Sequence, residues 1–213
     1  DGMMDEDAYE TFEILGEVYG KEERAQELIA YMDRVKEDLN MRIAGVPEEE
    51  KPTVYVGGVS FQGTHGFDGT EAGYGPLKAI GAKNLADETG QTGPFNIELE
   101  KVLAWDPDVI FLDYNGLDLI QEDYASNSEY YKQLTAVQKG NIYSQISFRS
   151  YASNLDLALA DTYYAASVLY PEQFADIDMK EKVSEIFETL LGDDISEELE
   201  EHGYEFGQIT IGK

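Results

Sequence analysis

Cysteine is absent from the sequence, and histidine is nearly so, with only His65 and His202. The missing thiols exclude disulfides, thiolate metal sites, iron–sulfur clusters and cysteine nucleophiles. Two imidazoles are too few for a zinc site built from several histidines, and a Ser-His-Asp triad would have to use one of the two. The sequence therefore excludes thiol-based sites and zinc sites with several histidines.

Basic side chains are scarce: 15 lysines and arginines stand against 44 aspartates and glutamates, for a net charge of −29. Such a field repels phosphate backbones and anionic headgroups, so nucleic acid and a bare membrane surface are poor partners. No apolar run approaches the roughly 18 residues of a membrane span, and the opening DGMMDEDAY has no signal-peptide pattern. With 213 residues, 42% of them hydrophobic, the chain can bury a core without disulfides.

The spacing of apolar residues predicts two helices at the start of the chain. Apolar residues three or four apart predict a short helix over residues 5–19, ended by Gly20, and a second helix over residues 21–44. At ~1.5 Å per residue, the second helix is about 36 Å long. That length suits a spine between two parts of a protein.

Short apolar strands then alternate with helices. Strands are predicted at TVYVGG, VIFL and NIYSQIS, with a short one near residues 208–211. Further helices are expected near residues 76–81, 96–105, 134–139, 154–169 and 180–191. This alternation is typical of an α/β fold in which helices cover both faces of a mostly parallel sheet. The stretch from Gly57 to Gly75 is expected to be a long glycine-rich loop, and its spacing fits no phosphate-binding motif.

Polar and aromatic side chains gather where the three main strands end. Because the carboxyl ends of parallel strands meet at one edge of a sheet, these segments are expected to line a small-molecule cleft. The candidate ligand-binding residues are Ser60, Phe61, Gln62, Thr64, His65, Tyr74, Asn115, Phe148, Arg149, Tyr151 and Asn154. No serine sits in a GxSxG elbow and no carboxylate pair has an acid–base spacing, so the sequence contains no recognisable catalytic set.

Several of these candidates have two interpretations. Arg149 is either a partner in a surface ion pair or a bidentate clamp on a carboxylate or another anionic group. His65 either bonds the backbone of its own loop or binds a metal or metal chelate. Asp113 either caps the loop after its strand or touches a ligand, and Phe148 and Tyr151 either cover the following helix or line the cleft.

Taken together, several segments resemble a class III substrate-binding protein. They are KPTVYVGG, GAKNLADE, ELEKVLAWDPDVIFLD, LTAVQKGNIYSQI and NLDLALADTYYAASVLYPEQFADID, in the order of the family, and GKEERAQELIAYMDRVKEDL resembles its long spine helix. These proteins are extracytoplasmic receptors of ABC importers for iron–siderophore, haem and cobalamin ligands. The resemblance implies a three-layer α/β/α lobe preceded by the spine. Residues 1–45 would be the end of an N-terminal lobe and the spine, and residues 46–213 the C-terminal lobe, while the remainder of the N-terminal lobe is not in the sequence.

The resemblance also implies partners for the chain. In the family, an acidic residue on each lobe docks onto arginines of the permease, and by position this residue is Glu100, with Glu98 as its neighbour. The chain would be no enzyme and have no intrinsic cofactor, and its transported ligand would be an iron chelate, haem or cobalamin. It would act outside the cytoplasm as a monomer, lipid-anchored in the full-length protein. Two alternatives stay open: an α/β enzyme that uses the strand-end face, and a stand-alone protein-interaction domain.

Overall fold

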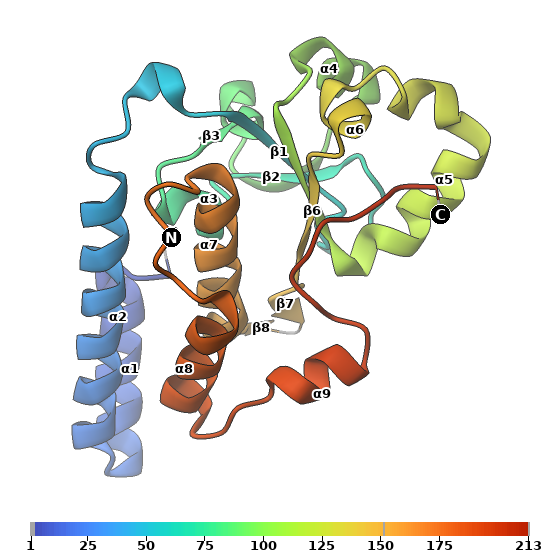
Figure 1. Ribbon diagram of the computed structural model, residues 1–213. Helices are drawn as coiled ribbons and strands as arrows, with labels where there is room; N and C mark the ends of the chain where they lie inside the picture. The colour runs from blue at the N-terminus through green and yellow to red at the C-terminus, as the bar shows by residue number, and fades with distance from the viewer. Residues whose placement is uncertain (1–2, 151, 213) are drawn as a thin grey trace.

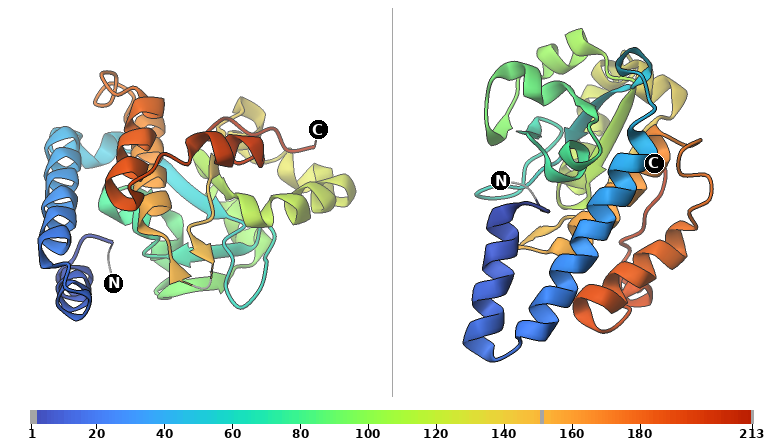
Figure 2. Two further views of the ribbon diagram at one scale, coloured as in Figure 1. Left: turned by 90° about the horizontal axis from the view of Figure 1, so that it is seen from below. Right: turned by 90° about the vertical axis from the view of Figure 1, so that its left-hand side faces the viewer.

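Two antiparallel helices open the computed structural model, which describes residues 3–150 and 152–212 (Figure 1). Helix α1 (Glu6–Tyr19) begins after Asp5, whose side chain accepts a hydrogen bond from the backbone of Ala8, and ends at Gly20 in the left-handed conformation. Helix α2 (Glu22–Ile43) then runs back beside α1, as both views in Figure 2 show. Both helices were predicted to within one residue at each end.

A parallel sheet of four strands forms the centre of the fold. Its strands are β1 (Thr53–Gly57), β3 (Lys83–Asn84), β5 (Val109–Asp113) and β6 (Ile142–Gln145), in the order β3-β1-β5-β6. Successive side chains of a strand point to opposite faces, so Val54 and Phe111 belong to one hydrophobic cluster and Tyr55 and Ile110 to the other. The sheet is therefore covered on both faces, which confirms the predicted three-layer α/β/α arrangement.

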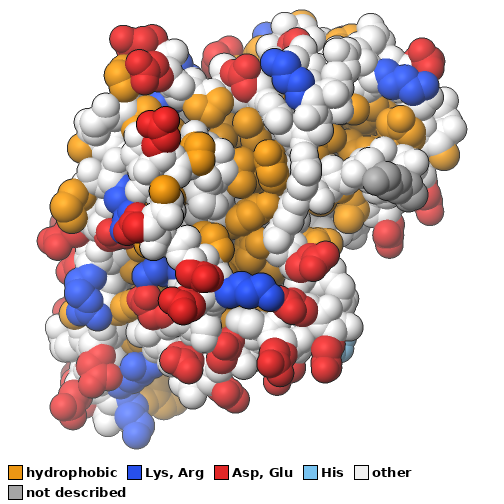
Figure 3. Space-filling view, viewed as in Figure 1, with side chains coloured by type: hydrophobic (Ala, Val, Ile, Leu, Met, Phe, Trp, Pro, Cys, Tyr) orange, Lys and Arg blue, Asp and Glu red, His pale blue; other side chains and the backbone are white. Residues whose placement is uncertain are grey.

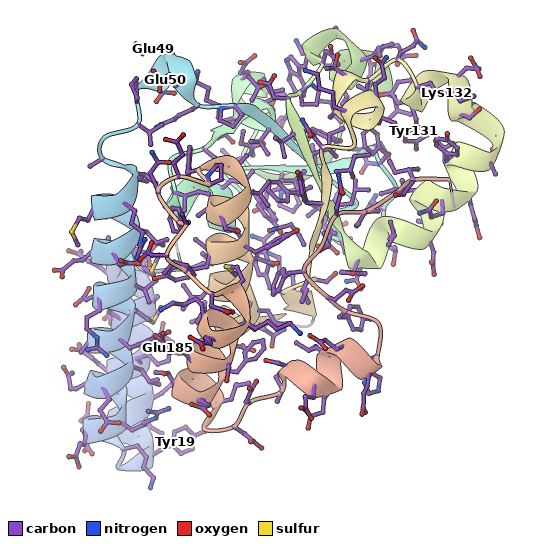
Figure 4. The ribbon with its side chains drawn as sticks, in the orientation of Figure 1. Tyr19, Glu49, Glu50, Tyr131, Lys132 and Glu185 are labelled. Atoms are coloured by element: carbon purple, nitrogen blue, oxygen red, sulfur yellow. The ribbon has the colours of Figure 1, made fainter. Side chains whose placement is uncertain are left out.

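The helices divide between these two faces. One layer holds α2, α3 (Gly75–Ala79), α7 (Leu155–Leu169) and α8 (Met179–Leu191), and the other holds α4 (Leu99–Trp105), α5 (Tyr114–Tyr131) and α6 (Thr135–Lys139). Polar contacts fasten α2 to its layer. The hydroxyl of Tyr31 donates at 3.1 Å to Glu185 of α8, which is labelled in Figure 4, and that of Tyr163 donates to Asp38 at 2.9 Å. The long helix is thus packed along the lobe.

A two-stranded ribbon lies where loops were expected. Strand β2 (Gly69–Ala72) pairs antiparallel with β4 (Gly93–Asn96), and the 3-10 helix η2 (Leu85–Thr89) lies between them in the chain. The prediction of one uninterrupted loop from Gly57 to Gly75 is therefore wrong. Both strands contain glycine, and β4 also contains proline, so their composition gives little sign of a strand. Gly69 pairs with Asn96 and Ala72 with Gly93, so each strand also depends on a segment that is distant in sequence.

One whole helix and one helix boundary also differ from the prediction. No helix was expected after β5, yet α5 starts immediately there, and the side chain of Asp113 caps it by accepting from the backbone N–H of Asn115. The helix expected to start at Asn96 begins at Leu99, because Asn96 belongs to β4 and its amide donates to Asp68. The segment after β5 is therefore the first turn of a helix.

The chain ends along the outer edge of β6. After α9 (Ser196–Glu201), Ser144 of β6 donates to the carbonyl of Gly207 at 2.9 Å, and Ile209 donates to that of Ile142 at 2.8 Å. Only an isolated bridge, Tyr143 to Gln208, represents the predicted short strand. The remaining short elements are η1 (Glu48–Glu50), β7 (Arg149–Ser150) and β8 (Ala152–Ser153).

Acidic side chains gather over α8 and α9 on the face shown in Figure 3. Over the described part of the chain, no helix is both long and apolar enough to span a membrane.

Candidate functional site

The segments that follow β1, β5 and β6 meet at one edge of the sheet. Gly58, just after β1, donates to the carbonyl of Gly66 at 3.0 Å, and a Cβ on Gly116 of α5 would lie 2.7 Å from the carbonyl oxygen of Gly58. Asn115 of α5 donates through its backbone to the hydroxyl of Ser147 at 3.0 Å, beyond β6. The strand ends are thus in direct contact, as expected from the parallel topology.

The loop after β1 is organised around His65. Its ring stacks on Phe61, with centroids 3.9 Å apart and planes 5° apart, and its Nε2 lies 2.8 Å from the carbonyl oxygen of Phe61. His65 thus contacts the backbone of its own loop through Nε2. Gln62 is in the left-handed region with φ at 50°, and it and Thr64 are exposed. The hydroxyl of Ser60 is buried and has no hydrogen-bond partner in the described part of the chain.

The segment after β6 supplies the opposite wall of the edge. Phe148 is buried and packs against the buried ring of Tyr74, with centroids 5.6 Å apart. Asn154, which precedes α7, donates through its side chain to the carbonyl of Phe148 at 3.1 Å and so holds the turn. Phe148 therefore packs on the core, and it also lines one of the cavities described below. The candidate Tyr151 lies outside the described residues.

Arg149 forms a bidentate ion pair with Glu71 of β2. Its Nη2 donates to Oε1 of Glu71 at 2.7 Å, and its Nη1 donates to Oε2. The side chain of Glu71 is only 4% exposed, whereas that of Arg149 is 35% exposed. The pKa of Glu71 is raised, because the effect of burial outweighs the opposing effect of Arg149. Arg149 is thus an ion-pair partner, but its acid is buried, and the two residues are 78 positions apart in the chain.

A cavity of about 730 Å³ opens beside this ion pair, a volume typical of small-molecule sites. A second cavity of about 360 Å³ adjoins it and extends to α1. Gly73, Arg149 and Ser153 line both cavities. We call the combined feature the Arg149 groove. Its first cavity is also lined by Glu71, Ala72, Lys78, Asp87, Gln91, Thr92, Gly93 and Pro94, and its second by Met3, Asp5, Asp7, Ala8, Thr11, Gly75, Phe148, Leu155 and Ala158.

Two further acids are buried beneath the strand ends. Asp113 accepts from the backbone of Asn115 at 2.9 Å and from the hydroxyl of Ser147, and burial raises its pKa to about 6. Asp161 of α7 is fully buried, accepts from the backbone of Ile146 at 2.8 Å, and has its pKa raised well above the ordinary value by burial. Among residues 3–150 and 152–212, no three acids or histidines are grouped so that they could hold a metal. Both acids accept hydrogen bonds from the segments that follow the strands.

The two acids expected to dock onto a permease are exposed at the start of α4. Glu98 is the residue before the helix, and Glu100 lies in its first turn. They follow β4, whose Asn96 contacts Asp68 at the end of the loop after β1. The helix start is thus tied to the loop that contains His65.

Comparisons with known proteins identify the fold. A family model described as "Periplasmic binding protein" matches residues 3–145. No curated protein matches the sequence. Among solved structures, the molybdate-bound MolA of Haemophilus influenzae is 18% identical with a TM-score of 0.70, and the alignment covers 94% of this chain and 57% of MolA.

Two other structures agree with this result. FepB of Veillonella parvula, described as a TroA-like periplasmic binding protein, is 24% identical with a TM-score of 0.65, over 88% of this chain and 58% of FepB. CeuE of Helicobacter pylori, in a Ni-His complex, is 18% identical with a TM-score of 0.65, over 91% of this chain and 61% of CeuE.

The chain spans less than two thirds of the length of each of these proteins. The matched proteins are solute-binding proteins and not enzymes, which agrees with the expectation from the sequence. The family match covers well over half of the chain, so this protein belongs to the periplasmic binding protein family.

Proposed function

We propose that the chain is part of a solute receptor that delivers its ligand to an ABC importer outside the cytoplasm. In this proposal, residues 1–45 provide the spine and its preceding helix, and residues 46–213 form the ligand-binding lobe. The observation that carries the proposal is the Arg149 groove, whose lining includes Phe148 and Arg149 from the segment that follows β6 at the carboxyl edge of the parallel sheet. In α/β folds of this kind, ligands bind outside that edge.

The ligand in this proposal is a metal chelate, with an iron chelate as the leading candidate and haem or cobalamin as related ones. MolA bound to molybdate and CeuE in a Ni-His complex indicate that this fold accepts metal-containing ligands of differing chemistry. Because Nε2 of His65 is engaged by its own loop, an intact chelate, whose metal is already coordinated, suits the site better than a bare ion. The chain itself would need no resident cofactor.

A cavity of this volume also favours a small-molecule receptor over a stand-alone protein-interaction domain. The candidate ligand contacts are Arg149 in the groove, and Ser60, Gln62, Thr64 and Asn115 at the strand ends.

A thermal-shift screen tests the proposal. The panel contains a ferric trihydroxamate, a ferric tris-catecholate, haem, cobalamin, molybdate and bare ferric ion. A ligand at about 100 times its Kd stabilises the folded chain by about 2.7 kcal/mol, which raises the Tm of a chain of this size by roughly 5–10 °C. Arg149→Gln should reduce the shift, whereas Lys180→Gln, which removes the same charge from an exposed position, should not. A panel in which no compound raises the Tm would contradict the proposal.

The permease contact needs a separate test. In the full-length receptor, expected to be a lipid-anchored monomer, Glu100→Arg should abolish uptake of the ligand while leaving its binding unchanged, and Glu98→Arg should have a smaller effect. Glu88→Arg, on the exposed part of η2, is the matched control and should transport normally. Equal uptake by the Glu100 and Glu88 variants would exclude Glu100 as a docking residue.

A further inference from the structure

Arg149 is neutralised before any ligand arrives. Its two terminal nitrogens bind the two carboxylate oxygens of Glu71, whose side chain is almost fully buried. This end-on pairing uses one N–H from each terminal nitrogen, so Glu71 leaves three of the roughly five guanidinium N–H groups unengaged. Arg149 can therefore donate hydrogen bonds into the groove without bringing an uncompensated positive charge.

The other charged side chains of the groove do not restore a positive field. In the first cavity, the two cations Lys78 and Arg149 are matched by the two acids Glu71 and Asp87. On the α1 side, Asp5 and Asp7 add two more acids. These groups lie within a chain whose net charge is −29. An anionic ligand would thus enter an unfavourable field, whereas a neutral or cationic one would not.

We propose that the Arg149 groove selects ligands without net negative charge, namely neutral or cationic metal chelates, and that Glu71 sets this preference by neutralising Arg149. The inference rests on the proposed function and specifies its substrate class. Hydrogen bonds from the guanidinium to ligand oxygens would provide affinity. Because the Arg149–Glu71 pair has no net charge, it would offer an anionic chelate no compensating cation, and this would provide selectivity against such chelates.

The position of Glu71 is fixed by the fold. It lies in β2, and its carbonyl oxygen accepts a hydrogen bond from the side chain of Asn84 at 2.9 Å. The same Asn84 side chain donates to Asp87 at 3.0 Å. Glu71 and Asp87 therefore line one cavity and share a neighbour, but within the described residues Arg149 forms its ion pair with Glu71 and not with Asp87. This makes Asp87 a matched control for Glu71.

Nuclear magnetic resonance titration of the ¹⁵N-labelled chain tests the inference. The probes are gallium(III) complexes, diamagnetic substitutes for ferric ones: a neutral trihydroxamate, a cationic trihydroxamate and a trianionic tris-catecholate. The Nε–H resonance of Arg149 and the amide resonances of Gly73 and Gly93 report binding in the groove. We expect the neutral and cationic complexes to bind at least about tenfold more tightly than the trianion.

Two variants assign this preference to Glu71. Glu71→Gln keeps an oxygen acceptor for Arg149 but removes the negative charge, and should raise affinity for the trianion by about tenfold. Asp87→Asn removes an equal charge from the same cavity and should raise it by less than about threefold. Equal effects of the two variants would contradict the role of Glu71.

The unmodified chain decides the question even if Glu71→Gln fails to fold. A preference for the trianion over the neutral complex would overturn the inference and leave the proposed function intact. A chain that binds none of the three complexes would contradict both this inference and the iron chelate as the ligand in the proposed function.

Discussion

Two arginines of this chain each bind a carboxylate through both terminal nitrogens, yet the two carboxylates differ in their exposure to solvent. Arg42 of α2 binds the two oxygens of Asp176 at 2.6 and 3.0 Å, and Arg149 binds those of Glu71. The side chain of Asp176 is 69% exposed, whereas that of Glu71 is 4% exposed. The same pairing geometry therefore occurs once in water and once against the core.

The two arginines also differ in the hydrogen bonds that they make beyond this carboxylate. Arg42 also donates through Nε to Asp38 at 3.0 Å and through Nη1 to the carbonyl of Gln173 at 2.9 Å, so it fastens α2 to the segment after α7. Over residues 3–150 and 152–212, Arg149 binds no second carboxylate, and it lines both cavities of the groove. The first arginine is a structural link, and the second is the one that we propose contacts the ligand.

The largest expected effect comes from removing the arginine of the buried pair. Arg149→Ala leaves Glu71 buried without its cation, and should lower the free energy of unfolding by about 3 kcal/mol at neutral pH. This is the low end of the usual range, because Arg149 is itself one third exposed. Urea denaturation measures the change, which should shrink under acid as Glu71 becomes protonated. An unchanged midpoint would mean that Glu71 does not need its partner.

Asp113 is a buried acid that accepts hydrogen bonds from neutral donors, so it can be compared with Glu71, whose partner is a cation. Burial raises the pKa of Asp113 from 3.8 to about 6, so the folded chain binds this proton more tightly than the unfolded chain. Its contribution to stability is fully present below about pH 4 and is lost as the pH rises through about 6, by at most about 3 kcal/mol. Asp113→Asn should therefore gain stability relative to the unmodified chain over this interval.

Denaturation curves from pH 4 to 7 measure this difference. The matched control is Asp178→Asn, which changes the cap of α8 at an exposed position. A stability difference for Asp113→Asn that does not change with pH would show that burial leaves the pKa of Asp113 at its ordinary value.

The smallest effect is expected at the exposed pair. Asp176→Asn removes the charge that faces Arg42 in water, and should cost less than about 1 kcal/mol, because solvent screens the interaction and Asp38 still binds the arginine. Raising the salt concentration should reduce even this difference. A loss as large as that of Arg149→Ala would mean that burial does not distinguish the two pairs.

Local sequence patterns predict some helices and strands of this fold well and others poorly. Helices α1, α2, α7 and α8 and strands β1 and β5 follow from local apolar spacing, so they were predicted closely. The cap at Asp113 and apolar residues such as Leu117, Ile120 and Tyr124 are local signals for α5 that were overlooked.

The Glu71–Arg149 pair has no local signal. Its acid lies in a glycine-containing strand that becomes a strand only by pairing with β4. Arg149 was found because it follows a strand, but nothing near it in sequence indicates its partner. Which acid reaches which base depends on the closed fold, and so the charge of the site could not be read from its residues.

The C-terminal segment that runs along β6 has a consequence for solubility. A sheet normally offers unpaired N–H and C=O groups on its outer strands, where a foreign strand can add and start aggregation. Here β3, at one side, is two residues long, and the backbone of residues 207–209 occupies the other. The C-terminal segment thus covers the exposed edge of β6, and a variant that lacks residues 207–209 should precipitate more readily when concentrated.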